Sequence, residues 1–438
     1  MTDTDTTDTK APPPPPPPVE ERRSGVVGLI LLIGGIVALG LLTRASIVVV
    51  ILAIIVMVFM HELGHYLTAK WSGMKVTEFF IGFGPRIWSF RRGETEYGVK
   101  AIPAGAYVRI IGMHNLEEVP PEDEPRTYRQ KSFPRRLSVA LAGSTMHFVM
   151  ALVCIYAILV SSGAAEGRLF DTRSLEQIDR ATPWMIGEVS DDSGAEAAGL
   201  RPGDRILEID GEPIVGFGDL PDEIAPRAGD DVTLLVRRGE REFEVGATIG
   251  RDEHGDGLLG VTVDRQFDMV SYGPSSAVPQ AFREFGRVTS ESLRALGRFF
   301  TPSGLSGFYD QVADGGEEAG ESAGNGSSGG GGGDNRIISI LGATRIGADA
   351  TEQGFEGLLF FLVVLNVFVG IFNLVPLLPL DGGHVAIAVY ERVRSRKGRP
   401  YHADVAKLLP LTYVVVLLLI TLGVTAMYLD IVNPVSID

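Results

Sequence analysis

The most constraining feature of this chain is a short polar motif placed directly after a long apolar run. Residues 61–65 read His-Glu-Leu-Gly-His and follow the unbroken apolar stretch Ile47–Met60. Residues four apart share one face of a helix, so His61 and His65 can turn a ring nitrogen toward the same metal ion. Glu62 lies where its carboxylate can take a proton from a water molecule. Since ionisable residues are rare in apolar helices, this spacing predicts a hydrolytic zinc centre within a membrane span.

Charged residues are segregated along the chain in a way that predicts its orientation. The formal net charge is −16, yet residues 70–136 hold 12 Lys and Arg against 8 Asp and Glu, and residues 376–407 hold 6 against 3. Residues 162–350 hold 17 against 34. Loops rich in Lys and Arg stay on the cytoplasmic side of a membrane. We therefore predict that the two basic loops are cytoplasmic and that the acidic region is extracytoplasmic.

Apolar segments long enough to span a membrane occur five times, at about 25–42, 47–69, 137–161, 355–376 and 408–429. The first is the weakest prediction, because an uncleaved signal-like anchor would look similar. The proline-rich stretch Pro12–Pro18 before it predicts a disordered tail. The single cysteine, Cys154, lies in an apolar run, which favours a free buried thiol.

The acidic region has an internal order of its own. Alternating runs at Gly187–Val189, Arg205–Ile209, Val232–Arg237 and Glu242–Ala247 predict strands, the last two as a hairpin. The string Ser193–Gly211 closely resembles the core of bacterial PDZ domains in their circularly permuted form. Such a domain captures an extended chain end by strand addition. The alternative is a small domain that only caps the membrane part.

Two further features follow this region. Val278–Phe300 shows helical spacing of aromatic and apolar residues with arginines between them. This pattern fits a helix lying on the outer leaflet, and packing against the PDZ-like domain explains it equally well. Gly315–Asp334 is predicted to be a flexible linker.

A third metal ligand is expected from another span. The segment 355–376 leads into the sequence Asn373 to His384, which contains Pro376, Pro379 and the run Asp381-Gly-Gly. Prolines and glycines unwind a helix, and this break would aim Asp381 into the bundle. By the charge pattern the break and the His61–His65 pair lie at the same depth, as a shared zinc ion requires. The alternative is that Asp381 is only a carboxylate at a helix end.

With these motifs the chain resembles the site-2 protease family, the zinc intramembrane proteases of regulated intramembrane proteolysis. The resemblance covers roughly residues 45–430 and favours the bacterial branch with a PDZ domain, particularly its actinobacterial members. Met74–Met113 is similar to the family's membrane-associated β-region. Lys131–Gly143 resembles the start of its second core span, and Leu408–Pro410 that of its last.

The resemblance assigns roles to individual residues. It implies that His61, His65 and Asp381 are the zinc ligands and that Glu62 is the general base. It implies that Asn373 holds the backbone of the substrate.

One departure from the family pattern concerns His147. Where the family usually has Ala-Gly-Pro-x-x-Asn, this chain has Ala142-Gly-Ser-Thr-Met-His147. We expect His147 to bind substrate in place of the missing asparagine or to be a polar partner of the site. Direct ligation is the lesser alternative, since a catalytic zinc ion needs an open position. His384 has a similar ambiguity, with a structural role near the helix break favoured.

The fold class implied is a polytopic α-helical membrane protein of about five spans in the bacterial plasma membrane. It has a cytoplasmic-side membrane-associated β-region and an extracytoplasmic PDZ-like α/β domain. The expected units are a tail (1–24), the first two spans (25–69), the β-region and loop (70–136), the second core span (137–161), a region holding the PDZ-like domain at about 184–250 (162–268), a helix and linker (269–354) and the C-terminal spans (355–438).

The expected function is zinc-dependent intramembrane cleavage of single-span membrane proteins, such as anti-sigma factors already trimmed by an upstream site-1-type protease. The lipid bilayer is the other partner, and no nucleic acid is expected. The alternating run Thr95–Ile102 is expected to offer an edge to an unwound substrate strand. Alternatives are processing of signal-peptide remnants or of an envelope or sporulation factor, and a non-catalytic PDZ scaffold. Glu62, which metal binding does not need, argues against the scaffold.

Overall fold

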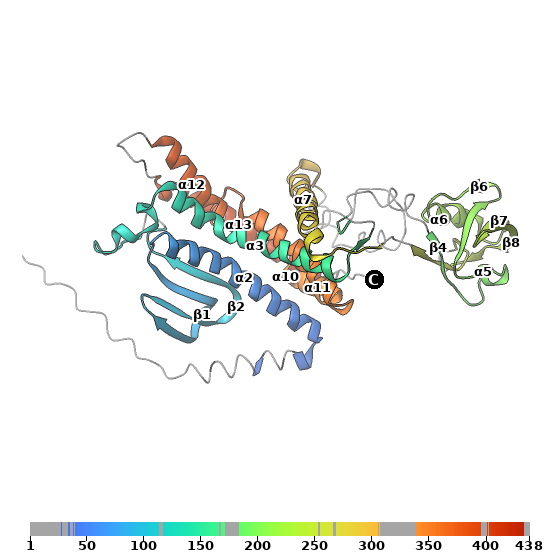
Figure 1. Ribbon diagram of the computed structural model, residues 1–438, viewed down its shortest axis with the longest axis horizontal. Coiled ribbons are helices and arrows are strands. Elements are labelled where there is room, and N and C mark those ends of the chain that lie inside the picture. Colours follow the sequence, from blue (N-terminus) through green and yellow to red (C-terminus); the bar gives the residue numbers. More distant parts are fainter. Residues whose placement is uncertain are drawn as a thin grey trace, which may run out of the picture.

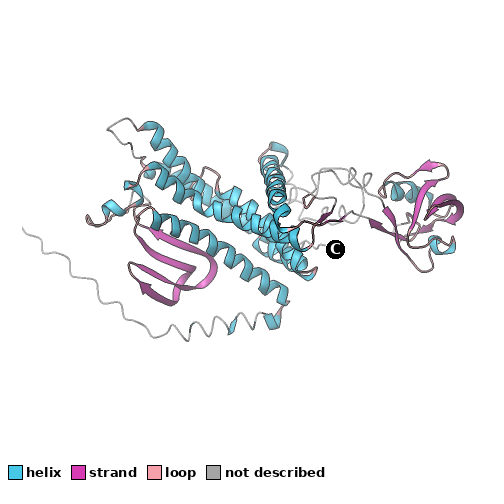
Figure 2. Cartoon of the chain, in the orientation of Figure 1, coloured by secondary structure: helices cyan, strands magenta, loops and turns pink. Residues whose placement is uncertain are grey.

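A computed structural model describes residues 40–113, 117–165, 168–170, 184–252, 255–265, 269–304, 339–395 and 403–432, with residues 28, 34, 35, 38, 306 and 401. Its parts follow one another along the longest axis (Figure 1). Strands β1 and β2 lie at one end, long helices occupy the middle, and a small α/β unit lies at the other end. The secondary structure is divided accordingly, with strands at the two ends and helices between them (Figure 2).

Four helices in the described part of the chain are long and apolar enough to cross a membrane. They are α2 (Ala45–Trp71), α3 (Phe133–Ser161), α11 (Phe355–Asn373) and α13 (Leu409–Val432). The predicted first segment, at about 25–42, lies mostly outside the described residues, as do the tail and the glycine-rich linker. Helix α3 is central, because it packs against both α2 and α11.

Small residues allow these helices to approach closely. A Cβ atom on Gly64 of α2 would lie 2.8 Å from the carbonyl oxygen of Ala142 on α3. A Cβ atom on Gly370 of α11 would lie 2.6 Å from the ring of Phe148 on α3. Close backbone approach at small residues is the usual way in which membrane helices associate. Helix α3 therefore approaches α2 closely near Ala142 and α11 closely near Phe148.

The predicted break after the third of these spans is confirmed. Helix α11 ends at Asn373, residues 374–380 are not helical, and α12 (Asp381–Arg394) begins with Asp381. The other end of α12 is tied to α3 by a buried ion pair, in which Glu391 lies 2.6 Å from Arg136. A short 3₁₀ helix, η4 (Val405–Leu408), leads into α13.

The β-region consists of β1 (Val76–Arg92) and β2 (Thr95–Ile110), each of which folds back on itself. Residues 95–100 pair with 86–92 on one side and, through 96–99, with 78–81 on the other. Residues 106–110 pair with the remaining side of residues 76–81. The prediction that Thr95–Ile102 forms an edge was therefore wrong for residues 96–99, which are paired on both sides. Local alternation shows that a segment is a strand, but pairing partners distant in sequence decide which strand is central.

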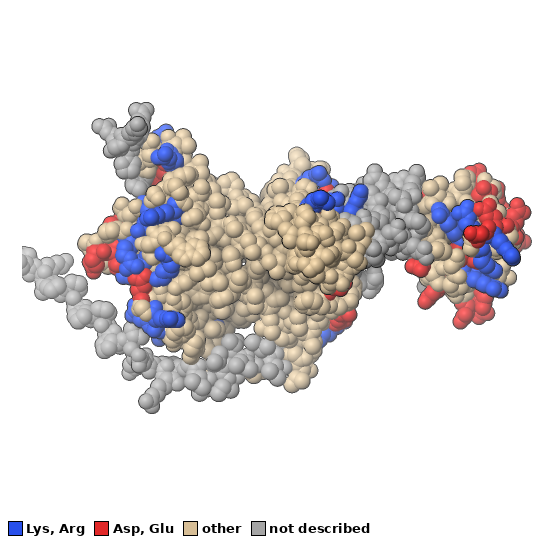
Figure 3. All heavy atoms as spheres, in the orientation of Figure 1, with Lys and Arg blue, Asp and Glu red and all other residues tan. Residues whose placement is uncertain are grey.

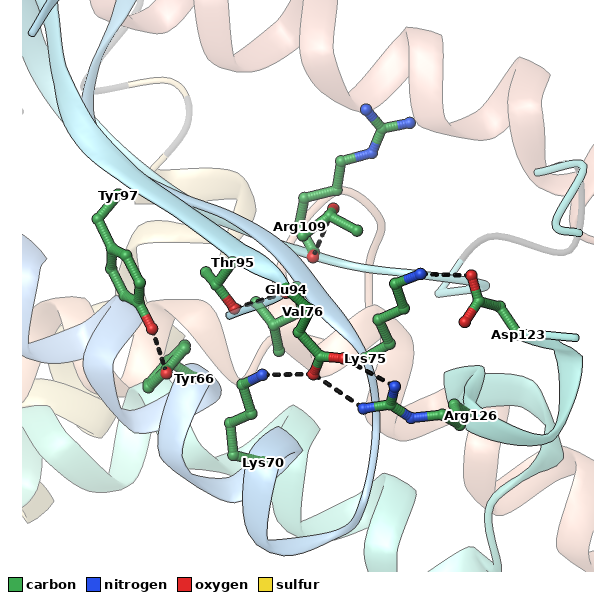
Figure 4. Close-up of polar contacts among 11 residues, drawn as sticks. Tyr66, Lys70, Lys75, Val76, Glu94, Thr95, Tyr97, Arg109, Asp123 and Arg126 are labelled. Atoms are coloured by element: carbon green, nitrogen blue, oxygen red, sulfur yellow. Dashed lines mark hydrogen bonds and ion pairs between the residues drawn. The ribbon is translucent and has the colours of Figure 1, made fainter. Parts of the chain in front are cut away.

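Polar contacts fasten this β-region to the end of α2 (Figure 4). Lys70 and Arg126 both bind the Glu94 carboxylate, at 2.6 and 2.7 Å. Pairing with Arg126, supported by Lys70, lowers the pKa of Glu94 to about 2. The hydroxyl groups of Tyr66 and Tyr97 lie 2.5 Å apart. These contacts hold the β-region within two helical turns of the His61–His65 motif. The 3₁₀ helices η1 (Glu124–Arg126) and η2 (Tyr128–Gln130) lie in the loop between β2 and α3.

The PDZ-like domain, residues 184–265, has its own apolar core, which includes Trp184, Ile206 and Leu234. Its main sheet has the order β6-β5-β7-β8, and β4 pairs with β11. The predicted hairpin is confirmed, because β7 and β8 pair in register from Asp231–Thr248 to Arg238–Arg241. The elements are β4 (Trp184–Val189), α5 (Gly194–Ala197), β5 (Asp204–Ile209), β6 (Glu212–Pro213), α6 (Asp219–Ile224), η3 (Ala225–Arg227), β7 (Asp231–Arg238), β8 (Arg241–Thr248), β9 (Gly250–Arg251), β10 (Gly257–Leu258) and β11 (Val261–Arg265).

Two other helices brace the long ones. Helix α7 (Pro274–Phe299) buries Ala277 and Ala281 against α3 and α11 and not against the core of the PDZ-like domain. A position on the outer leaflet stays a prediction. A short pairing of β3 (Ala164–Ala165) with β12 (Met269–Val270) leads into it. Helix α10 (Ile340–Glu352), which the sequence did not predict, packs on α2 and α11.

The surface reflects the charge segregation of the sequence. Lys and Arg side chains gather over the end that carries β1, β2 and α12, while the helical middle presents mostly uncharged surface (Figure 3). Acidic side chains are prominent on the PDZ-like domain at the other end. An uncharged band between two charged ends is the surface that a membrane-spanning protein presents to lipid and water.

Candidate metal centre

The break between α11 and α12 brings Asp381 against the histidine pair of α2. One ligand atom from each of His61, His65 and Asp381 lies within 4.8 Å of the other two. The two histidine Nε2 atoms are 3.2 Å apart, and Asp381 Oδ2 lies 3.4 Å from that of His61 and 3.3 Å from that of His65. Asp381 thus converges on the same point as two histidines that lie more than 300 positions before it in the sequence.

This triangle has the dimensions of one face of a zinc coordination tetrahedron. Zinc–ligand bonds of about 2.0–2.1 Å at the tetrahedral angle place two ligand atoms about 3.3–3.4 Å apart. Asp381 Oδ2 is also buried without a hydrogen-bond partner among the described residues. A buried carboxylate oxygen without a partner is costly unless a cation joins it. The donor set of two imidazoles and a carboxylate therefore fits zinc and leaves the fourth corner open.

His65 and Asp381 are each positioned by a different neighbouring element. His65 is held by its second ring nitrogen, because Nδ1 donates to the carbonyl oxygen of Val139 on α3 at 2.8 Å. That bond leaves Nε2 as the unprotonated atom that faces the centre. Asp381 is the first residue of α12, so its position is set by the point at which the preceding loop ends and the helix begins.

Gly143 on α3 is a site residue that the sequence analysis did not identify as one. A Cβ atom at this position would lie 2.3 Å from His61 Cε1 and 2.5 Å from His65 Nε2. Cβ atoms essentially never come so close to other heavy atoms. Gly143 therefore provides the space that both imidazole rings occupy. The Ala142-Gly143 pair could have drawn attention to it, but only the packing of α3 on α2 shows what the glycine accommodates.

Glu62 lies beside the metal-ligating group without belonging to it. It is the next residue after His61 on α2, and its carboxylate lies near the backbone of Val108 on β2. The edge of the β-region formed by residues 106–110 thus lies next to Glu62. A carboxylate close to the ligands but not among them is free to accept a proton.

The two residues expected to bind substrate lie in different places. Asn373 is the last residue of α11, at the start of the break. His147 on α3 is buried, and its ring centroid lies 5.0 Å from that of His61. His147 is not in the close group of ligand atoms found among the described residues. Its Nδ1 instead bonds to Asn366 on α11, a second residue that the sequence analysis missed. His384 lines a small cavity with Arg136 and Glu391.

Comparison with known proteins identifies the family. The model of peptidase family M50 matches residues 49–319 and 332–420, most of the chain. The chain belongs to peptidase family M50. This is the site-2 protease family, and the resemblance noted from the sequence is confirmed.

Curated relatives of this M50 peptidase agree with that assignment. The zinc metalloprotease Rip1 of Mycobacterium tuberculosis is 34% identical over 411 residues, covering 88% of this chain and 96% of the relative. Rip1 of Mycolicibacterium smegmatis is 33% identical, with 88% and 97% covered. A putative zinc metalloprotease of Mesorhizobium japonicum is 31% identical, with 78% and 88% covered. The chain is a zinc-dependent intramembrane protease.

A solved structure similar to part of this M50 peptidase is the PDZ domain of an SdrC-like protein from Listeria monocytogenes. It is 27% identical and covers 18% of this chain and 85% of that one, with a TM-score of 0.17.

Proposed function

We propose that His61, His65 and Asp381 hold the catalytic zinc ion and that Glu62 is the general base in the hydrolysis of a peptide bond within the membrane. The observation that carries this proposal is the triangle of ligand atoms at 3.2, 3.3 and 3.4 Å. A general base accounts for the position of Glu62, a carboxylate beside these atoms and outside their set.

The chemistry divides between the metal and the chain. When bound, zinc polarises the scissile carbonyl and acidifies the water that attacks it. Glu62 accepts one proton from that water as the new C–O bond forms. The same carboxylic acid then donates the proton to the amide nitrogen, the C–N bond breaks, and Glu62 is again a carboxylate. One water molecule is consumed and a carboxyl and an amino end are formed.

A helical substrate must be locally extended before its peptide bond can be attacked. We propose that residues 106–110 of β2 hold the extended segment, because their edge lies next to Glu62 through Val108. An exposed strand edge binds an extended chain through its backbone groups. Asn373, at the start of the break in α11, is proposed to contact the substrate backbone as well. An Asn373→Leu variant with an unchanged KM would exclude that role.

The metal site is tested by zinc content. Purified protein is expected to bind one zinc ion per chain, and Asp381→Ala is expected to lose at least 100-fold in zinc affinity, since one of three ligands is removed. The measurement is competition with a chelator followed by elemental analysis. Asp404→Ala, which removes an exposed carboxylate near the start of α13, is the matched control and should bind zinc normally. Zinc retention by Asp381→Ala with unchanged affinity would remove Asp381 from the site.

The orientation in the membrane is a further proposal. The segregation of charge supports a cytoplasmic β-region and an extracytoplasmic PDZ-like domain. A cysteine introduced at the half-buried Ser193 in a Cys154→Ala background is therefore expected to react with a membrane-impermeant thiol reagent on intact cells. Labelling that requires cell lysis would reverse the topology.

The proposed substrates are single-span membrane proteins, such as anti-sigma factors, that an upstream protease has already trimmed. In this proposal the PDZ-like domain excludes substrates whose outer domain is intact. Deleting residues 184–265, which removes β4 together with its partner β11, should leave cleavage of a trimmed substrate intact and increase cleavage of the untrimmed form.

This deletion also distinguishes exclusion from recruitment. If the domain recruits substrate, cleavage of both forms should fall, by about 30-fold or more for a lost peptide contact of about 2 kcal/mol. An equal loss of cleavage for the trimmed and the untrimmed substrate would contradict the proposal that the domain excludes substrates. Mass spectrometry of membrane fragments that accumulate in an Asp381→Ala background would identify the natural substrate.

A further inference from the structure

Helix α12 carries Asp381 as its first residue, so the rotation of this helix about its own axis decides where the carboxylate points. The helix runs beside α3 (Figure 1) and makes no comparable contact with another helix in the described part of the chain. Successive residues of a helix are about 100° apart, so a turn by one residue would carry Asp381 away from the histidines. The rotation of α12 against α3 must therefore be fixed.

The residues that follow Asp381 have no side chains that could hold this rotation. Gly382 and Gly383 form the rest of the first turn of α12. A Cβ atom on Gly382 would lie 2.3 Å from the carbonyl oxygen of Leu374, and one on Gly383 would lie 2.7 Å from the backbone nitrogen of Leu378. This end of the helix therefore packs on the preceding loop through its backbone alone.

One face of α12 is turned toward α3. Residues 381, 384, 388 and 391 are three or four positions apart, which places them on a single face of a helix. The last three line a small cavity of about 20 Å³ together with Arg136 of α3. Ala388 and Glu391 are buried, at 1% and 2% exposed. Asp381 at the start of α12 and Glu391 near its end thus belong to the same face.

Glu391 and Arg136 hold the far end of this face. Arg136 Nη2 lies 2.6 Å from Glu391 Oε2, and both side chains are buried. The other oxygen of the carboxylate accepts a hydrogen bond from the backbone amide of Ala403 at 2.7 Å. The guanidinium group of Arg136 lies over the Tyr128 ring, 5.7 Å from its centroid. A buried ion pair is costly to break, because each charge would be left without its partner.

The face of α3 that carries Arg136 also contacts the histidines. Arg136, Val139 and Gly143 follow the spacing of one helix face, with Gly143 two turns from Arg136. The carbonyl oxygen of Val139 accepts the hydrogen bond of His65, and Gly143 provides the space for both imidazole rings. A single face of α3 therefore contacts the histidines of α2 and the helix that carries Asp381.

We propose that Arg136 and Glu391 are positioning residues of the metal site, and that they act through Asp381. Their ion pair fixes the rotation of α12 against the face of α3 that contacts the histidines, so that the Asp381 carboxylate meets the histidine ring nitrogens. Neither residue belongs to the group of ligand atoms found among the described residues. The inference rests on the proposed zinc site.

The first test measures zinc affinity of the full-length protein by competition with a chelator. Glu391→Gln keeps an acceptor for Ala403 but turns an amino group toward Arg136. It should weaken zinc binding by about 10-fold, the low end of the usual loss for a group that orients a metal ligand. Arg136→Met should have a similar effect. The double variant should be no weaker than the weaker single variant, since the pair acts as a unit.

The second test asks whether the pair acts through Asp381. Asp381→Ala already removes the ligand, so adding Glu391→Gln to it should cause no further loss of zinc affinity. A merely structural role would weaken zinc binding to the same extent in both backgrounds. The matched control is Asp204→Asn, which breaks another buried ion pair, with Arg238 at 2.7 Å, in the separate core of the PDZ-like domain. Its zinc affinity should be unchanged.

Three results would overturn the inference. Unchanged zinc affinity in Glu391→Gln and Arg136→Met would mean that the loop before Asp381 positions the carboxylate alone. Recovery of normal affinity when both charges are removed would mean that each single variant suffers only from an unpaired buried charge. A further loss in the Asp381→Ala background would mean that the pair supports the bundle as a whole. If Asp381→Ala itself binds zinc normally, the proposed zinc site fails, whereas loss of zinc there with normal binding in Glu391→Gln refutes only this inference.

Discussion

Replacing Glu62 by glutamine is expected to abolish peptide cleavage while zinc stays bound. Glutamine has nearly the same shape as glutamate but cannot accept the proton of the attacking water. Residue 62 is not in the group of side chains that could hold the metal, so the substitution removes no ligand atom. Loss of a general base typically lowers the rate by about 10²–10⁴-fold. The measurement is the cleavage rate of a trimmed single-span substrate in detergent or vesicles, together with zinc content.

A matched control for this variant is Glu356→Gln at the opposite end of the bundle, where the carboxylate contacts Ser162. This variant should cleave at the normal rate. Cleavage by Glu62→Gln at more than a tenth of the normal rate would rule out Glu62 as the base. Loss of zinc in Glu62→Gln would instead mean that the carboxylate supports the metal.

Gly143→Ala is expected to disrupt the metal site by adding a single methyl group. The added carbon would lie 2.3 Å from one ring and 2.5 Å from the other, and one of those two atoms is His65 Nε2, which faces the centre. Either the two imidazole rings must rotate or α3 must move away from α2. Both changes would move apart the atoms of His61, His65 and Asp381 that face the proposed metal position. Zinc affinity should fall by at least 100-fold and cleavage should be lost. The readouts are chelator competition and the same cleavage assay.

Gly423→Ala on α13 is the control for Gly143→Ala, because nothing lies within 4 Å of a Cβ atom there. It places the same methyl group in another span, and it should bind zinc and cleave normally. Normal zinc affinity in Gly143→Ala would mean that the two helices are further apart in the membrane than their packing here indicates.

The sequence by itself predicted the features that depend on local spacing. The His61–His65 pair needs only the four-residue repeat of a helix, and the break before Asp381 needs only the backbone preferences of proline and glycine. The β7–β8 hairpin is equally local, because its turn and its alternation lie within one short segment. The structure agrees with all three, since each follows from residues close together in the chain.

Only the tertiary structure decided the features that depend on distant partners. The sheet order that makes residues 96–99 central is set by pairing with both halves of β1. The packing of α7 on α3 and α11 is set by apolar residues on all three helices. The space filled by the rings at Gly143 and the contact between Asn366 and His147, 219 residues apart, exist only once the helices have met. Periodicity fixes which face of a helix is polar or small, but not which helix will lie against that face. For that reason the three side chains that converge could be predicted from the sequence, and the residues packed around them could not.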